Sequence, residues 1–186
     1  LNLMGLLQAE GAHVVFLPSD RKYAFADTQR LQSMGVECWH APFVSTIPAW
    51  LREHGRRFDT VVLCRHYVAR EFLPLARMYA PQARIVFDTI DLHYLREQRG
   101  AALSDDPSLA RTARETRRLE LDVIARSDTT VVVSESEKAL LRTDAPDADV
   151  EVISNLHQVA GPGLPYAERR DLLFVGGFRH PPNVDA

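Results

Sequence analysis

Short apolar runs rich in β-branched residues recur through this chain at nearly constant intervals. The first four begin at residues 13, 36, 60 and 84, so about 23 or 24 residues separate successive starts. That interval accommodates a strand and a crossover helix, and continuous apolar runs of this length are typical of strands covered on both faces. The runs are 13–17, 36–40, 60–64, 84–89, 129–133, 150–153 and 172–175. The pattern predicts an α/β fold with a doubly wound parallel sheet.

Helix signals lie between these runs. Asp106 followed by Pro107 is a favourable N-cap and N1 pair for a long helix that reaches about residue 126. Ser134 and Glu137 have the spacing of a capping box directly after a strand. Other predicted helices cover residues 1–11, a segment capped by Asp27 and ending at Gly35, 47–54, and 69–79, where Pro74 either kinks the helix or marks its start.

Two segments interrupt the alternation of strands and helices. Residues 91–106 carry no strand pattern and are predicted to be a long connection that follows a strand. Residues 155–170 contain Gly161, Pro162, Gly163 and Pro165, which is typical of a linker. The prediction is therefore a first domain over residues 1–154, a linker over 155–170, and the start of a second domain over 171–186. Both ends of the chain are expected to be cut inside helices.

Composition excludes several classes of protein. The net charge of −3 and the isoelectric point of about 6.2 do not fit a basic nucleic-acid-binding surface. Cys38 and Cys64 are predicted to stay unbridged, because two cysteines are no disulfide framework; a reducing, cytoplasmic location follows. No apolar run approaches the ~20 residues of a membrane span. The arginines of 107–126 form either a solvated face, balanced by Glu115 and Glu120, or a contact with an anionic membrane.

Polar residues follow two consecutive strands of the predicted sheet. Asp91 and His93 come after the run at 84–89, and His66 comes after the run at 60–64. In open α/β sheets, ligands bind beyond the carboxyl ends of the strands, so these side chains are candidates for acid, base or hydroxyl-binding roles. The alternative is that Asp88 or Asp91 caps local backbone and that the histidines are ordinary loop residues. The cysteines and histidines show no metal-ligand spacing.

A second candidate site follows the run at 172–175. Gly176 and Gly177 allow a ligand to approach the backbone closely, and Arg179 adds a positive charge. A phosphate is the ligand that such backbone N–H groups and a following helix N-terminus favour. The alternative is an ordinary tight turn between a strand and a helix.

Three segments together resemble the retaining glycosyltransferases of GT-B fold in glycosyltransferase family 4. They are residues 85–97 (IVFDTIDLHYLRE), residues 127–137 (SDTTVVVSESE) with 152–155 (VISN), and residues 172–178 (LLFVGGF). Their order and spacing resemble the acceptor-side strand and loop, the last strands of the first domain, and the opening strand of the donor-binding domain.

The resemblance implies two Rossmann-like domains that face a cleft, with the first strand lying before Leu1 and the second domain truncated. It implies transfer from a nucleotide sugar to an unknown acceptor with retention, and no metal cofactor. Asp91, His93 and His66 are then expected to position the acceptor hydroxyl and the sugar ring. Gly176, Gly177 and Arg179 are expected to meet the leaving diphosphate. With the donor half almost wholly absent, the fragment alone is expected to be inactive.

The sequence departs from the family in two places. Asp88 stands where the family often has a histidine, and no lysine occurs from Phe178 to Ala186. Two other classes remain open. A sugar-nucleotide epimerase shares the architecture, and a non-catalytic α/β module, such as a receiver or a dinucleotide-binding domain, shares the strand pattern.

Overall fold

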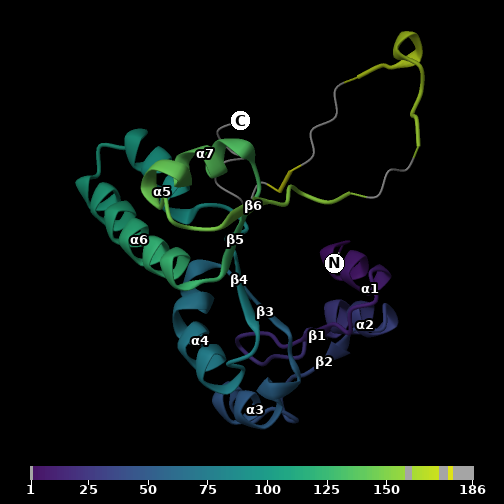
Figure 1. Ribbon diagram of the computed structural model, residues 1–186. Coiled ribbons are helices and arrows are strands. Elements are labelled where there is room, and N and C mark those ends of the chain that lie inside the picture. Colours follow the sequence, from purple (N-terminus) through teal and green to yellow (C-terminus); the bar gives the residue numbers. More distant parts are fainter. Residues whose placement is uncertain (1, 158–160, 172–175, 178–186) are drawn as a thin grey trace.

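The structure is a computed structural model that describes residues 2–157, 161–171, 176 and 177. Figure 1 shows its helices and strands in chain order. They are α1 (Asn2–Ala9), β1 (Val15–Phe16), α2 (Phe25–Ser33), β2 (Glu37–Cys38), α3 (Ile47–His54), a 3-10 turn (Gly55–Arg57), β3 (Thr60–Cys64), α4 (His66–Tyr79), β4 (Arg84–Asp88), α5 (His93–Ala102), α6 (Pro107–Arg126), β5 (Thr129–Val132), α7 (Glu135–Asp144), β6 (Val150–Val152) and a second 3-10 turn (Tyr166–Glu168).

The strands in the described residues pair in parallel, which confirms the predicted α/β class. Four of them form a sheet in the order β3-β4-β5-β6, with Thr60 opposite Arg84 and Thr130 opposite Val150. Each of these strands is followed or preceded by a helix that returns the chain to the same end of the sheet, as parallel pairing requires. This arrangement is consistent with a Rossmann-like fold.

The prediction of one continuous sheet over residues 12–154 is wrong. Strands β1 and β2 pair only with each other and form a separate two-stranded parallel sheet. They are also shorter than the apolar runs that predicted them. Each of the two strands pairs with the other on one side only, and the ladder between them is two residues long, from Val15 opposite Glu37 to Phe16 opposite Cys38.

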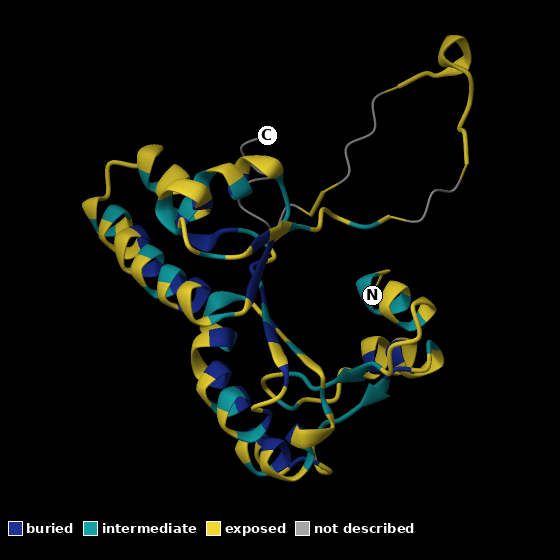
Figure 2. Ribbon diagram, in the orientation of Figure 1, coloured by how far each residue is buried: buried dark blue, intermediate teal, exposed yellow. Residues whose placement is uncertain are grey.

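The core lies between the four-stranded sheet and its helices. Ile85 and Phe87 of β4 are fully buried, and Val123 and Ile124 of α6 pack in the same cluster. Figure 2 shows the dark, buried stretch that follows β4 and β5. Contact between α4 and α6 places both helices on one side of this sheet, visible to its left in Figure 1.

Burial differs between strands that the sequence pattern treats alike. All four residues of β5 are buried, so both faces of that strand are covered as predicted. In β3 only Leu63 is buried, and Val62 is 42% exposed. The difference follows from position: β5 lies between two strands, whereas β3 is an edge strand of its sheet.

Helix boundaries agree with the sequence where local signals dominate. Helix α3 spans the predicted 47–54, and α6 spans Pro107–Arg126 with the carboxylate of Asp106 accepting from the Ser108 N–H at 2.8 Å. The hydroxyl of Ser134 accepts from the Glu137 N–H, which confirms one half of the predicted capping box of α7; the Glu137 carboxylate accepts instead from the backbone of Val133 and Leu92.

Other helix predictions need correction. Helix α4 begins at His66 rather than at residue 69 and continues through Pro74. Helix α2 begins after Ala24, so Asp27 lies in its first turn, where a carboxylate favours the helix dipole, and does not cap it. Residues 91–106, predicted as a long connection without strand pattern, contain α5, which was not among the predicted helices.

Beyond β6 the chain leaves the body of the fold. Residues 161–171 are exposed throughout and include one 3-10 turn, in keeping with a linker composition (Figure 1). The predicted strand at 172–175 and most of the predicted second unit lie outside the described residues. None of the helices in the described part of the chain has the length and apolar character that crossing a bilayer requires.

Candidate functional site

The carboxyl ends of β3 and β4 lie next to each other, because the two strands pair in register up to Cys64 and Asp88. The chain turns sharply after each strand: Arg65 and Ile90 both have positive φ, at 73° and 64°. Each turn leads into a helix whose first residue is a histidine, His66 in α4 and His93 in α5. The same arrangement of strand, turn and helix therefore places both predicted histidines at one edge of the sheet.

The two imidazoles are in contact. Their ring centroids lie 4.8 Å apart with the ring planes at 75°. Tyr67 stands beside them, 5.5 Å from His66 and 6.1 Å from His93 between ring centroids, and its side chain is half exposed. His93 is buried, whereas His66 is partly exposed, so a solvent-borne ligand reaches this pair from the His66 side. Burial of the imidazole is the main cause that lowers the pKa of His66, and the nearby His93 lowers it further.

Asp91, the third predicted residue, lies in the same cluster. Its backbone carbonyl oxygen is 3.1 Å from Nδ1 of His93, and its carboxylate oxygen is 3.7 Å from the same nitrogen. Arg96, one turn into α5, donates to the other carboxylate oxygen. The carboxylate is thus held between a guanidinium and an imidazole, so it orients His93 and is itself fixed by an ion pair.

Asp88 caps local backbone, which is one of the two roles that the sequence left open for it. Its carboxylate accepts a hydrogen bond from the Ile90 N–H at 3.0 Å and so stabilises the turn between β4 and α5. Burial raises the pKa of the Asp88 carboxyl. The thiol of Cys64 lies 3.9 Å from this carboxylate, and Cys38 and Cys64 are both free, which confirms the predicted lack of a bridge.

Two further carboxylates hold the start of α5, and sequence reasoning missed their role. Glu120 of α6 accepts from the backbone N–H groups of His93 at 3.3 Å and Tyr94 at 3.1 Å. Glu137 of α7 accepts from the Leu92 N–H at 3.2 Å and, with its other oxygen, from the Val133 N–H at 3.0 Å. The first turn of a helix has unpaired N–H groups, and here remote carboxylates satisfy them.

Glu120 corrects the interpretation of the long helix. It was expected to balance surface arginines, but it is fully buried, and only Glu115 forms such a pair, with Arg118 at 2.7 Å. Burial raises the pKa of Glu120 to about 7. The signal that identifies it is its place on the apolar stripe of α6, which consists of Ala113, Thr116, Glu120, Val123 and Ile124.

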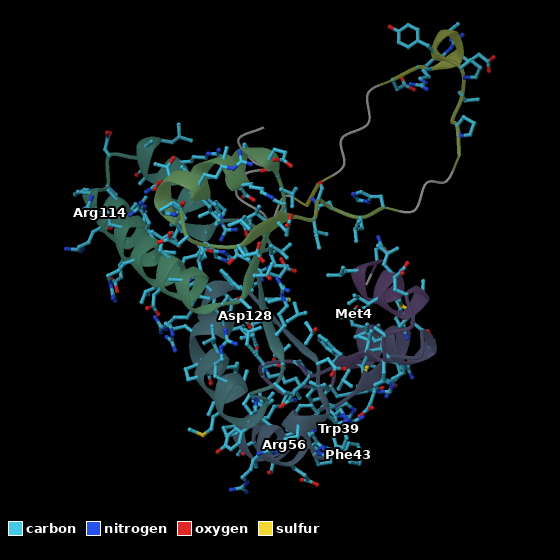
Figure 3. The ribbon with its side chains drawn as sticks, viewed as in Figure 1. Met4, Trp39, Phe43, Arg56, Arg114 and Asp128 are labelled. Carbon is cyan, nitrogen blue, oxygen red and sulfur yellow. The ribbon has the colours of Figure 1, made fainter. Side chains whose placement is uncertain are left out.

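The arginines of α6 face different surroundings. Arg117 binds Asp144 of α7 at 2.7 Å and lies over the ring of Tyr94. Arg114 projects from the outer side of the helix, away from the strands (Figure 3). The prediction of a solvated face therefore holds for part of the run only.

The second candidate site is only partly visible. Gly176 and Gly177 are exposed, and Arg179 lies outside the described residues. The structure therefore brings Asp91, His93 and His66 together, and the geometry of the predicted phosphate-binding residues relative to them stays a prediction.

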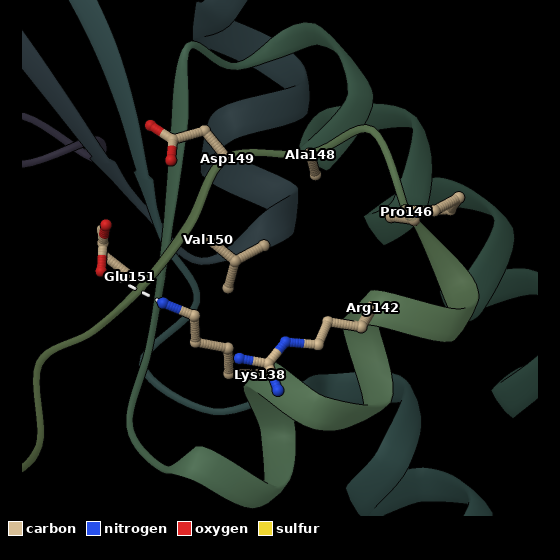
Figure 4. Close-up of a pocket in the computed structure, with 8 residues that line it drawn as sticks. Lys138, Arg142, Pro146, Ala148, Asp149, Val150 and Glu151 are labelled. Atoms are coloured by element: carbon tan, nitrogen blue, oxygen red, sulfur yellow. Dashed lines mark hydrogen bonds and ion pairs between the residues drawn. The ribbon is translucent and has the colours of Figure 1, made fainter.

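Two hollows in the described surface lie away from the histidine cluster. One of about 440 Å³ is lined by Arg111, Thr112, Glu115 and Thr116 of α6. Another of about 260 Å³ lies between α7 and β6, where Lys138 pairs with Glu151 at 3.2 Å (Figure 4). Neither of these two hollows is lined by His66, His93 or Glu120, so the histidine cluster is defined by its side-chain chemistry.

Comparison with protein-family models, with curated proteins and with solved structures found no match to this chain. The fold and the cluster define an α/β protein with a parallel sheet and a buried histidine–carboxylate centre at the carboxyl ends of two adjacent strands.

Proposed function

We propose that this chain is the acceptor-side domain of a retaining glycosyltransferase of GT-B fold, joined by residues 155–170 to a donor-binding domain that begins near residue 171. The observation that carries the proposal is the meeting of His66 and His93, with ring centroids 4.8 Å apart, at the carboxyl ends of β3 and β4. That edge of an open parallel sheet is where α/β proteins bind their ligands.

Each residue of the cluster has a role suited to this reaction. The imidazole of His66 is partly exposed and can hydrogen-bond an acceptor hydroxyl or a sugar hydroxyl. A lowered pKa keeps that imidazole neutral near neutral pH, so one ring nitrogen remains an acceptor for a hydroxyl proton. His93 is held from behind by Asp91 and, through its backbone, by Glu120. Such fixed placement of binding groups contributes to rate by orienting the reacting atoms.

The donor side of the proposal comes from the sequence resemblance. A nucleotide sugar is the donor, and Gly176, Gly177 and Arg179 meet the leaving diphosphate through backbone N–H groups and one guanidinium. Cytoplasmic localisation belongs to the same proposal, because nucleotide sugars and free thiols fit that compartment.

The test uses the enzyme that contains this domain together with its donor-binding domain. It is incubated with a panel of nucleotide sugars and with saccharide and lipid-linked acceptors, and release of nucleoside diphosphate is measured. We expect release that depends on acceptor, with retained anomeric configuration in the product. An epimerised nucleotide sugar without diphosphate release would instead identify a sugar-nucleotide epimerase.

Variants link the reaction to the cluster. Replacing a group that binds or exchanges a proton with the reacting hydroxyl typically lowers the rate on the order of a hundredfold or more, so we expect this for His93→Ala. The same scale applies to Arg179→Ala, which removes a charge that stabilises the leaving group. Arg114→Ala on the outer face of α6 is the matched control and should leave turnover unchanged. Full activity in both His93→Ala and Arg179→Ala would place the site on other residues.

A further inference from the structure

The cluster around His93 contains a set of atoms that no proposed step uses together. His66, His93 and Glu120 each offer a metal-ligating atom, and the three atoms lie within 4.8 Å of one another. They come from three different helices, α4, α5 and α6, which contact each other in this region. We propose that His66, His93 and Glu120 form a binding site for a divalent transition-metal ion, with Zn²⁺ as the fitting ion.

The ligand set favours zinc over harder ions. Two imidazoles and one carboxylate are nitrogen and oxygen donors of the kind that bind zinc, whereas Mg²⁺ and Ca²⁺ prefer oxygen alone. Ligand atoms in tetrahedral zinc sites lie about 3.3 Å apart, given bond lengths of about 2.0–2.1 Å. The ligand atoms would therefore approach one another on metal binding, from separations of up to 4.8 Å.

The hydrogen-bond partners of His93 and Glu120 are arranged like the outer shell of a metal site. Nδ1 of His93 lies 3.1 Å from the carbonyl oxygen of Asp91 and 3.8 Å from Oε1 of Glu120; in the tautomer that donates from Nδ1 to the carbonyl oxygen, Nε2 keeps the lone pair that a metal requires. Both oxygens of Glu120 accept backbone N–H groups, which fixes the carboxylate in a buried position. Metal-binding histidines and carboxylates are typically oriented in this way.

Unsatisfied atoms border the same cluster. Nδ1 of His66 and Oε2 of Glu97 are buried and have no hydrogen-bond partner among the described residues. Buried polar atoms are nearly always paired, so both atoms are available to bind an ion. Glu97 lies in α5 one turn after His93, on the same side of that helix.

Charge supports a cation at this place. The carboxylates of Asp91 and Glu120 lie 3.7 Å and 3.8 Å from Nδ1 of His93, so two acidic groups adjoin the cluster. Arg96 is bound to Asp91. A divalent ion balances the remaining carboxylates, and three protein ligands leave one coordination position for water, a substrate oxygen or Glu97.

The site does not rest on the proposed glycosyltransferase function, and its test needs no substrate. The purified chain is treated with a chelator, dialysed, and titrated with ZnCl₂ by calorimetry, with thermal unfolding recorded with and without zinc. Co²⁺ replaces Zn²⁺ in a parallel sample to record its visible absorption, which is intense only for low-coordinate sites. We expect one ion per chain, a rise in the unfolding temperature by linkage, and a tetrahedral Co²⁺ spectrum.

Variants decide which residues hold the ion. His66→Ala, which alters a partly exposed side chain and should fold normally, and His93→Ala should each weaken zinc binding by more than the 10–100-fold that outer-shell changes typically cost. His13→Ala is the matched control, because His13 pairs with Glu37 on the surface. Absence of zinc binding by the folded chain overturns the proposal, as does binding that His66→Ala leaves intact or that only His13→Ala removes.

Discussion

The carboxylate of Glu120, in the middle of α6, accepts hydrogen bonds from the backbone of His93 and Tyr94 at the first turn of α5. One buried side chain thereby holds the helix that carries the candidate histidine. The helix start lacks a side-chain cap of its own, since its N-cap residue is Leu92. Position of His93 and stability of the fold consequently depend on the same carboxylate.

Glu120→Ala should therefore destabilise the chain strongly. The substitution leaves two buried N–H groups unpaired, at about 1–3 kcal/mol each, so we expect the free energy of unfolding to fall by about 2–6 kcal/mol. Urea unfolding followed by circular dichroism measures it. Glu115→Ala on the exposed side of the same helix should change stability by no more than about 0.5 kcal/mol. Equal losses of unfolding free energy in the two variants would show that the hydrogen bonds of Glu120 do not stabilise the fold.

Gly55 should not tolerate a side chain, whereas Gly100 should. A Cβ at Gly55 would lie 2.6 Å from the carbonyl oxygen of Tyr79, so backbone must shift, and we expect Gly55→Ala to cost about 1–3 kcal/mol. A Cβ at Gly100, inside α5, meets nothing within 4 Å, and Gly100→Ala should stabilise by about 0.5–1 kcal/mol. Thermal unfolding of both variants gives the comparison, and a stabilising Gly55→Ala would contradict the packing of α4 against this turn.

The thiol of Cys64 should react slowly. The residue as a whole is exposed, but desolvation of its sulfur and the charge of Asp88 together raise the pKa of Cys64 to about 11, and only the thiolate is nucleophilic. At pH 8 we expect alkylation of Cys64 to be at least about tenfold slower than that of a free thiol. Iodoacetamide labelling of a Cys38→Ser variant measures this rate. Asp88→Asn in that background should accelerate it, and an unchanged rate would exclude the carboxylate as a cause.

Glu37 should make the free energy of unfolding depend on pH. Partial burial favours its neutral form, but hydrogen bonds from Trp39, His13 and Arg57 outweigh this effect and lower the pKa of Glu37 to about 2. Its unfolded value is near 4.5, so the folded chain gains stability above that pH and loses the gain as pH falls toward 2. The difference in unfolding free energy between the wild-type chain and Glu37→Gln should therefore be larger at pH 6 than at pH 3. An equal difference at the two pH values would contradict this prediction.

Much of the fold follows from local patterns in the sequence. Thr60–Cys64 was predicted residue for residue, and Asp106 with Pro107 identified the start of α6, because hydrophobic runs and caps act over a few residues. The candidate histidines could be anticipated too, since parallel strands bring their carboxyl ends to one edge. The structure places the two rings in contact at that edge, and their role in a site stays a prediction.

Features that depend on distant partners could not be anticipated in the same way. Helix α5 has a polar sequence and no local cap, and the carboxylates that stabilise it come from α6 and α7. Glu120 on a helix rich in arginine is most simply interpreted as a surface charge, and only tertiary packing buries it. The division into two sheets likewise depends on which strand edges meet, a relation between elements that no local pattern records.

The exposed edge of β3 has a consequence for handling this chain. Within the described residues β3 bonds to β4 on one side only, and Val62 remains 42% exposed. An unpaired edge presents a row of N–H and C=O groups that recruits extended peptides, including those of another molecule. The net charge of −3 is modest, so repulsion between molecules offers little protection. The five residues of β3 are consequently one place where self-association of the purified protein can begin, and a lysine placed there is a direct means of opposing it.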